Sequence, residues 1–361
     1  MTESPNQICS WLQEAVQRGA SDLHLVAGHP PILRLHGELQ PLDEPVFDEN
    51  LALTELLPLC SEETQEAFAK TRNADFALKL PAATADESEQ RFRANLFYSG
   101  QAIGACFRVI PSQIPEFTWA GFSYDLAERL IGFRNGLVLI TGVTGAGKTT
   151  SLAMLIDLLN QQGGNRIITI EEPIEFIHPR YESSVVTQRE VGQDVQSFAD
   201  GLKYGLRQDP DVLLVGEIRD RDTAQLALSA AETGHLVFST LHARDAKGAV
   251  SRMTDLFPET VQSDVRSQLS MSLRAVVSQH LVPGAEQGSK RELAVEIMFN
   301  NSPIANGIRA GKFETIDNNI QTGRSDGMIS LDDSIKDLFQ RRKISRATAE
   351  RFVTNAGVLN W

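Results

Sequence analysis

The sequence has little cysteine, fewer basic than acidic residues, and no long apolar run. Its three cysteines, Cys9, Cys60 and Cys106, lie far apart and are odd in number, which excludes a readable disulfide framework or Cys-x-x-Cys zinc site. The 34 basic residues against 47 acidic ones give a net charge of −13, which argues against a nucleic-acid partner. No stretch approaches the roughly 18 apolar residues of a membrane span, and no signal-peptide pattern opens the chain. We therefore expect a cytoplasmic protein.

The pattern of apolar residues changes near residue 111 of the 361, which indicates two domains. Helical spacing predicts a helix over 6–18, and residues 49–71 have a helical pattern as well. The acidic stretch 81–90 is expected to form an exposed loop. Strands of alternating polarity are expected at 23–26, 32–35, 91–97 and 103–109. Together these elements predict a small α+β domain over residues 1–111.

The second part of the chain has the pattern of a parallel sheet. It follows a linker expected at 112–118. Apolar runs without alternation occur at 137–141, 166–170, 212–216 and 236–240. Such runs, with helices between them, are typical of strands that are buried on both faces. The sequence therefore predicts an α/β domain with a mostly parallel sheet over residues 119–361.

Residues 142–149 read GVTGAGKT and lie between an apolar strand and an amphipathic helix. This pattern is typical of a phosphate-binding loop, whose glycines let backbone N–H groups point at phosphates while Lys148 reaches the β- and γ-phosphates. The Thr149 hydroxyl is placed to bind Mg²⁺. A glycine-rich turn without a ligand is the alternative, but a lysine at an electropositive helix start favours a bound anion. The residues expected to bind the nucleotide are Gly142, Val143, Thr144, Gly145, Ala146, Gly147, Lys148, Thr149 and Thr150.

Acidic residues follow two of the predicted strands. Glu171, Glu172 and Glu175 come after the second strand, at the edge where open α/β sheets bind ligands. A carboxylate there can activate the water that attacks a γ-phosphate, although a solvated acidic turn would have the same sequence. Glu217 follows the third strand and is the expected acid of the second phosphate-loop ATPase motif. We expect it to hold Mg²⁺ through the water shell of the ion.

Histidines and arginines supply further candidates. His235 and His242 flank the fourth strand, and they are either structural or able to sense the γ-phosphate. Arg91 and Arg93 alternate with apolar residues on one strand of the first domain, and Arg108 lies on its partner strand. Such arginines are either solvated or available to stabilise charge in phosphoryl transfer, including in a neighbouring subunit. The residues alone leave these alternatives open.

Several motifs, in their order along the chain, resemble those of PilT-like type IV pilus retraction ATPases, within the type II and IV secretion ATPase superfamily. The matching segments are SDLHL at 21–25, RFRANLF at 91–97, GVTGAGKTT at 142–150, TIEEPIEF at 169–176, LRQDPDVLLVGEIRD at 206–220 and AAETGHLVFSTLH at 230–242. The resemblance implies a PAS-like N-terminal domain and a RecA-like ATPase domain with a helical C-terminal part. It also implies a homohexameric ring that hydrolyses ATP with Mg²⁺.

The resemblance implies a role for each candidate residue. Glu175 corresponds to the general base of the family, and Glu217 to its Walker B acid. The histidine motif of the family corresponds to His235 and His242. The basic stretch from which family members present arginines to nucleotide, some across the subunit boundary, corresponds to Arg91, Arg93 and Arg108. Implied partners are an inner-membrane pilus platform protein and a paralogous retraction or assembly ATPase, with peripheral association at the inner membrane.

Two departures from the family pattern bear on function. Glu172 stands where the family usually has aspartate, a change that preserves charge. The C-terminal motif AIRNLIRE is altered to IANGIRA at 304–310, in a segment implicated in retraction rather than hydrolysis. The alternatives are an accessory retraction ATPase, a slow nucleotide switch, and an assembly or type II secretion ATPase. Enzymes of the last kind usually carry a four-cysteine zinc segment, for which this chain lacks the cysteines.

Overall fold

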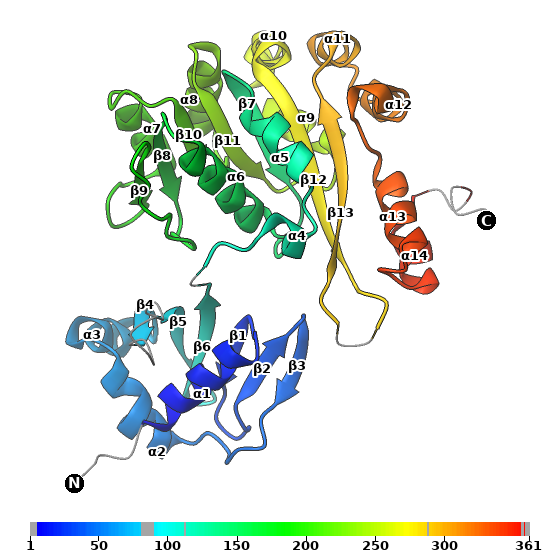
Figure 1. Cartoon of the computed structure of the whole chain (residues 1–361). Helices are drawn as coiled ribbons and strands as arrows, with labels where there is room; N and C mark the ends of the chain where they lie inside the picture. The colour runs from blue at the N-terminus through cyan, green and yellow to red at the C-terminus, as the bar shows by residue number, and fades with distance from the viewer. Residues whose placement is uncertain (1–5, 81–89, 112, 287–288, 355–356, 358–361) are drawn as a thin grey trace. The chain divides into compact units, whose positions relative to one another are not determined.

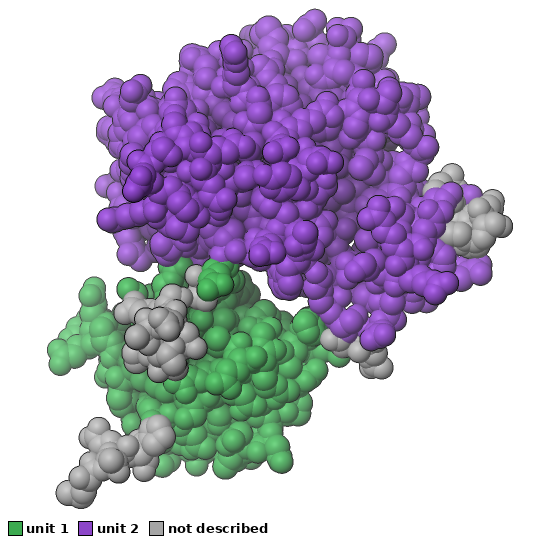
Figure 2. Space-filling model, in the orientation of Figure 1, with its two compact units in different colours: residues 1–113 green, residues 114–361 purple. Residues whose placement is uncertain are grey.

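The computed structural model describes residues 6–80, 90–111, 113–286, 289–354 and 357. The chain divides into two compact units, residues 1–113 and 114–361 (Figure 2). The division lies within the stretch 112–118 that was expected to be the linker. The acidic loop expected at 81–90 lies outside the described residues, apart from Gln90 at the start of a strand. None of the described helices is long and apolar enough to cross a bilayer.

Unit 1 contains a six-stranded antiparallel sheet in the order β3-β2-β1-β6-β5-β4 (Figure 1). Its strands are β1 Asp22–Leu25, β2 Ile32–Leu35, β3 Glu38–Pro41, β4 Asn73–Leu80, β5 Gln90–Ser99 and β6 Ala102–Ile110. The predicted helix forms as α1 Gln7–Gln17 and buries Trp11 in the core that also holds Phe92, Ala94 and Leu96 of β5. The alternate residues of β5 therefore lie on the other face of the sheet.

The helical pattern expected for residues 49–71 is confirmed, with a break at Cys60. The segment forms α2 Glu49–Leu51, a π-turn and a 3₁₀-turn, and then α3 Glu62–Thr71. Pro58 lies in the 3₁₀-turn, where it has no backbone N–H to donate, and Cys60 is extended. The hydroxyl of Ser61 then accepts a hydrogen bond from the N–H of Thr64 and caps the new helix α3.

Unit 2 contains a seven-stranded sheet in the order β13-β12-β7-β11-β10-β8-β9, in which only β13 runs antiparallel. Its strands are β7 Gly136–Thr141, β8 Arg166–Glu171, β9 Val185–Glu190, β10 Val212–Val215, β11 Leu236–Leu241, β12 Leu273–Val282 and β13 Glu292–Phe299. The described helices are α4 Phe117–Ala120, α5 Tyr124–Ile131, α6 Lys148–Gln162, α7 Phe198–Gly205, α8 Arg221–Glu232, α9 Ala246–Asp255, α10 Gln262–Ser272, α11 Ser302–Ala310, α12 Thr315–Thr322, α13 Leu331–Gln340 and α14 Arg346–Phe352 (Figure 1). The predicted mostly parallel α/β sheet is confirmed.

The strand order decides which loops meet. The neighbouring strands β7, β11, β10 and β8 are parallel, so their carboxyl ends lie at the same edge of the sheet. The phosphate-binding loop follows β7, His242 follows β11, Glu217 follows β10, and Glu172 follows β8. Open α/β sheets bind their ligands at this kind of edge.

Candidate active site

The loop between β7 and α6 has the backbone that a phosphate-binding loop requires. Gly142, Gly145 and Gly147 all have positive φ, at 146°, 77° and 86°. Gly142 also lies against β12: a Cβ there would be 2.6 Å from the carbonyl oxygen of Gln279. Only glycine fits this position. Helix α6 begins at Lys148, so the backbone N–H groups of its first turn face the loop.

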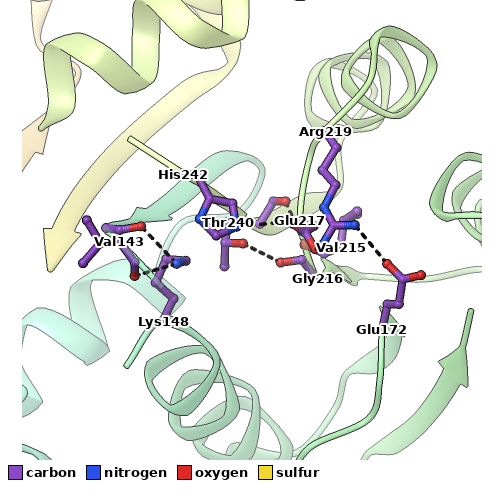
Figure 3. A network of polar contacts seen from close by, with 11 residues as sticks. Val143, Lys148, Glu172, Val215, Gly216, Glu217, Arg219, Thr240 and His242 are labelled. Carbon is purple, nitrogen blue, oxygen red and sulfur yellow. Dashed lines mark hydrogen bonds and ion pairs between the residues drawn. The ribbon is translucent and has the colours of Figure 1, made fainter. Parts of the chain in front are cut away.

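Lys148 is held inside the loop. Its Nζ donates hydrogen bonds to the carbonyl oxygens of Gly142 at 3.0 Å and Val143 at 3.1 Å (Figure 3). Burial lowers the pKa of Lys148, while the negative charges of Glu217 and Glu175 raise it. Glu217 and Glu175 follow β10 and β8, whose carboxyl ends lie at the same edge of the sheet as the loop that contains Lys148.

Glu217 lies just beyond β10, and its side chain is 12% exposed. One carboxylate oxygen is paired with Arg219, which also approaches Glu172 at 3.4 Å (Figure 3). The other, Oε2, is 3.3 Å from Nε2 of His242 but has no hydrogen-bond partner among the described residues. The end of β10 is fixed by Thr240, whose hydroxyl donates to the carbonyl of Gly216 at 2.7 Å.

The three acids after β8 have different environments. Glu171 is buried, and its Oε1 accepts hydrogen bonds from Thr169 at 2.6 Å and Gln188 at 3.1 Å. Burial raises the pKa of this carboxyl. Glu172 is exposed and faces Arg219, whereas Glu175 is partly buried and acts electrostatically on Lys148. A role of Glu175 as the base stays a prediction.

The two histidines lie at opposite ends of β11, as expected of residues that flank this strand, and their role at the nucleotide stays a prediction. His242 is at the carboxyl end, beside Glu217. His235 precedes the strand, and its carbonyl accepts from the N–H of Gly136 at the start of β7. Its Nδ1 lies 3.0 Å from the carbonyl of Ala230. Six strand residues separate the histidines by roughly 20 Å, so within one chain His235 is remote from the phosphate-binding loop.

The predicted arginines lie on the polar face of the unit 1 sheet. Arg93 of β5 is directly opposite Arg108 of β6 in the strand register, and Arg91 is two residues away on the same face. Arg108 pairs through Nε with Oδ1 of the buried Asp22 at 3.0 Å. This pair holds one guanidinium group in place on an otherwise exposed surface. A role of the three arginines at the nucleotide stays a prediction, as does that of Thr149 and Thr150 in the first turn of α6.

Sequence reasoning missed two residues that contact the phosphate-binding loop. Gln279 of β12 donates from Nε2 to the hydroxyl of Ser151 at 2.6 Å, and its backbone lies against Gly142. Arg291, which precedes β13, approaches the carbonyl of Gly145 through Nη1 at 3.5 Å. Both lie more than 100 positions along the chain from the loop. The basic pair at 290–291 was the only available signal, and its position depends on strands that were not predicted.

Known proteins with similar sequences and structures extend along nearly the whole chain. The family model for "Type II/IV secretion system protein" matches residues 5–328. The type IV pilus retraction ATPase PilT of Pseudomonas aeruginosa is 40% identical over 95% of this chain and 96% of its own length. The type IV pilus ATPase PilU of the same organism is 34% identical over 92% of this chain and 85% of its own length.

A crystal structure of the pilus retraction motor PilT with bound ADP superposes with a TM-score of 0.83 at 37% identity, covering 97% of this chain and 98% of that one. The expected order of an N-terminal unit followed by a RecA-like unit is therefore confirmed, and the resemblance seen in the motifs is confirmed as well. The chain belongs to the type II/IV secretion system protein family and is a phosphate-loop ATPase of the pilus retraction type.

Proposed function

We propose that this chain is the subunit of a hexameric, Mg²⁺-dependent motor that converts ATP into ADP and phosphate and powers the retraction of type IV pili. The observation that carries the proposal is that Lys148, Glu217 and Glu175 follow the parallel strands β7, β10 and β8, whose carboxyl ends lie at one edge of the unit 2 sheet. The similarity to PilT over 95% of the chain supports the retraction role in particular.

The chain's own groups divide the chemistry of hydrolysis. Lys148 and the N–H groups of the loop hold the phosphates and offset their negative charge. Glu175 orients a water molecule in line with the γ-phosphate and accepts its proton as the new P–O bond forms. The bond between the β–γ bridging oxygen and the γ-phosphorus breaks, and ADP leaves as the anion. His242 lies beside Glu217 and in this proposal responds to the presence of the γ-phosphate.

The residues around the loop fit a magnesium ion. Oε2 of Glu217 is buried without a hydrogen-bond partner among the described residues, and such an oxygen suits contact with the water shell of a hard cation. The Thr149 hydroxyl, on the first turn of α6, would bind the ion directly. When bound, Mg²⁺ would neutralise charge on the β- and γ-phosphate oxygens.

The ring supplies the remaining parts of the proposal. Residues 1–111 form the PAS-like domain, 112–118 the linker and 119–361 the ATPase domain. Arginines of the PAS-like domain, Arg91, Arg93 and Arg108, stabilise phosphate charge, at least one of them across a subunit boundary. Movement between domains during hydrolysis acts on an inner-membrane platform protein. The motor is thus peripherally attached to the membrane from the cytoplasm.

Genetic complementation tests the direction of the motor. Cells that lack this gene are expected to carry excess pili that do not retract, and wild-type protein should restore twitching. Lys148→Ala should not restore it, because the phosphates lose their lysine contact. Cells without surface pili would contradict the proposal and indicate an assembly ATPase instead.

An accessory retraction ATPase is the second candidate. The observation that favours it is the altered segment 304–310, which forms α11 with Gly307 buried at its centre. An accessory enzyme would leave basal retraction intact after deletion and would need a primary motor to restore force. Optical-trap measurement of retraction force in the deletion strain separates the two roles: abolished retraction indicates the primary motor.

A further inference from the structure

The loop that carries Glu175 connects β8 to β9, and side chains of β9 hold it. We propose that Gln188 and Glu190, here called the β9 clamp, are positioning residues that fix Glu175 for its action on water. This inference rests on the proposed role of Glu175 as the base. It adds the residues that set the geometry of that base.

The clamp binds the backbone on both sides of Glu175. The N–H of Ile174 donates to Oε2 of Glu190 at 3.0 Å. The carbonyl of Phe176 accepts from Nε2 of Gln188 at 2.8 Å. The residue before the base and the residue after it are therefore each tied to one strand. Such ties restrict the two peptide units from which the Glu175 side chain projects.

Gln188 uses both ends of its amide for this purpose. Its Oε1 accepts from the N–H of His178 at 3.0 Å, and its Nε2 also donates to Oε1 of Glu171 at 3.1 Å. One side chain thus joins the last residue of β8 to two backbone groups of the loop. Glutamine is suited to this position, because it offers donors and an acceptor on the same amide.

The clamp is itself fixed. In the parallel pair of β8 and β9, Gln188 is opposite Thr169 and Glu190 is opposite Glu171. The second oxygen of Glu190 accepts from Nε2 of Gln193 at 2.5 Å. Phe176 is only 3% exposed and anchors the loop in the core. Because the clamp residues are held in the sheet, their hydrogen bonds restrict the movement of the loop, as expected of groups that support a catalytic residue.

Misplacing a catalytic group by about 1 Å can cost a hundredfold in rate. Loss of the clamp should accordingly lower kcat while leaving nucleotide affinity unchanged, because Lys148 and its loop do not depend on β9. We expect Gln188→Met, which keeps the length of the side chain but not its hydrogen bonds, to lower kcat at least about tenfold. The dissociation constant for ADP should stay within about twofold. Glu190→Ala should lower kcat, and Glu190→Gln, which keeps an acceptor for Ile174, should recover part of the loss.

The matched control is Thr187→Val on the same strand. Its hydroxyl accepts from Arg166, and among the described residues it makes no hydrogen bond to residues 172–178. This variant removes a polar contact of β9 without touching the clamp, so its kcat should match that of wild type. Full-length protein is used throughout, with circular dichroism and sedimentation to compare folding and assembly. A clamp variant with wild-type kcat, or with ADP affinity lost in parallel with kcat, would overturn the proposal.

A double mutant separates failure of the clamp from failure of the proposed function. If Gln188 acts through Glu175, adding Gln188→Met to Glu175→Gln should cause little further loss of the residual turnover. Additive losses would show that Gln188 acts elsewhere and would contradict the clamp. Full turnover in Glu175→Gln alone would instead refute the base on which the clamp depends.

Discussion

At the scale of single residues, the ammonium group of Lys148 is the positive charge of the phosphate-binding loop. Two loop carbonyls hold this group, and two carboxylates counteract the lowering of its pKa by burial. An ammonium group at the start of a helix is unfavourable unless an anion compensates it. The same arrangement that is poor for an isolated helix is therefore suited to binding phosphate.

Replacing Lys148 by alanine should lower ATP turnover at least about a hundredfold, because the transferred phosphoryl group loses a preorganised positive charge. The measurement is steady-state phosphate release by purified protein with Mg²⁺. Circular dichroism should show a folded chain, since the glycine backbone of the loop does not depend on the ammonium group. Turnover within twofold of wild type would contradict the assignment of the loop.

The raised pKa of Glu296 in β13 should make the stability of the protein depend on pH. Burial is the main reason why the pKa of the Glu296 carboxyl is raised to about 7, and the charges of Asp245 and Asp317 raise it by smaller amounts. The hydrogen bond from the N–H of Ala246 and the charge of Lys247 lower the same pKa. Between pH 4.5 and 7 the folded chain keeps a proton that the unfolded chain loses, so stability falls as pH rises.

Glu296→Gln should remove this loss. Relative to the variant, wild type should lose up to about 1.4 kcal/mol for each pH unit in that window. Thermal unfolding of both proteins from pH 5 to 8 measures the difference, and the gap in Tm should widen up to about pH 7 and then stay constant to pH 8. Parallel curves for the two proteins would show that Glu296 is not protonated in the folded state.

Residues whose role depends on local sequence were predictable, and residues that act across the fold were not. The loop containing Lys148 could be recognised because its glycines, lysine and threonine are consecutive. Gln188 and Arg291 could not, because their partners are set by strand order. The positions of His235 and His242 on either side of β11 were predictable, because both flank a single apolar run in the sequence.

At the scale of elements, helix α11 explains one departure from the family motif. Gly307 is buried, and a Cβ at that position would be 2.8 Å from Oγ1 of Thr315, the first residue of α12. The missing side chain therefore lets α12 approach α11 closely. The altered motif is accommodated by the packing of two helices, and neither helix contributes to the loop that contains Lys148.

Restoring leucine at position 307 should destabilise the protein. Gly307→Leu would force α12 away from α11, at a cost of about 1–3 kcal/mol for overpacking. Thermal unfolding measures this change, with Ala310→Glu as the matched control. Ala310 is exposed at the end of the same helix, so its replacement should change stability by no more than about 0.5 kcal/mol. Equal Tm values for Gly307→Leu and wild type would contradict the close packing.

Two strands of unit 2 that were not predicted lack the usual sequence signals of a strand, each in a different way. Strand β9 lies at an edge of the sheet and mixes valines with polar residues, so it lacks the apolar run of a central strand. Strand β12 begins at the residue after α10 ends, with no intervening turn signal. Strand β7, which was predicted, is buried along its whole length.

At the scale of the whole molecule, the proposed site is divided between subunits. The acids and the phosphate-binding loop belong to unit 2, whereas the arginines belong to unit 1. Arginine is suited to such a role because its guanidinium group stays charged and binds phosphate oxygens through two donors. A ring in which one subunit completes the site of the next would couple hydrolysis to movement between domains.

Mixed rings test this division. Subunits with Glu175→Gln and subunits with Arg91, Arg93 and Arg108 all replaced by alanine should each be inactive alone. Mixing them should restore part of the turnover, since some interfaces would combine an intact base with intact arginines of the neighbour. Arginines acting within their own chain would give no recovery, because every site would then carry one defect.

The central claim is that Glu175 activates water at the site built around Lys148 and Glu217. It is tested most directly by steady-state ATP turnover of full-length Glu175→Gln with Mg²⁺, alongside ADP affinity. The account predicts a loss of turnover of at least about a hundredfold with affinity unchanged within about twofold. Turnover equal to that of wild type would contradict it.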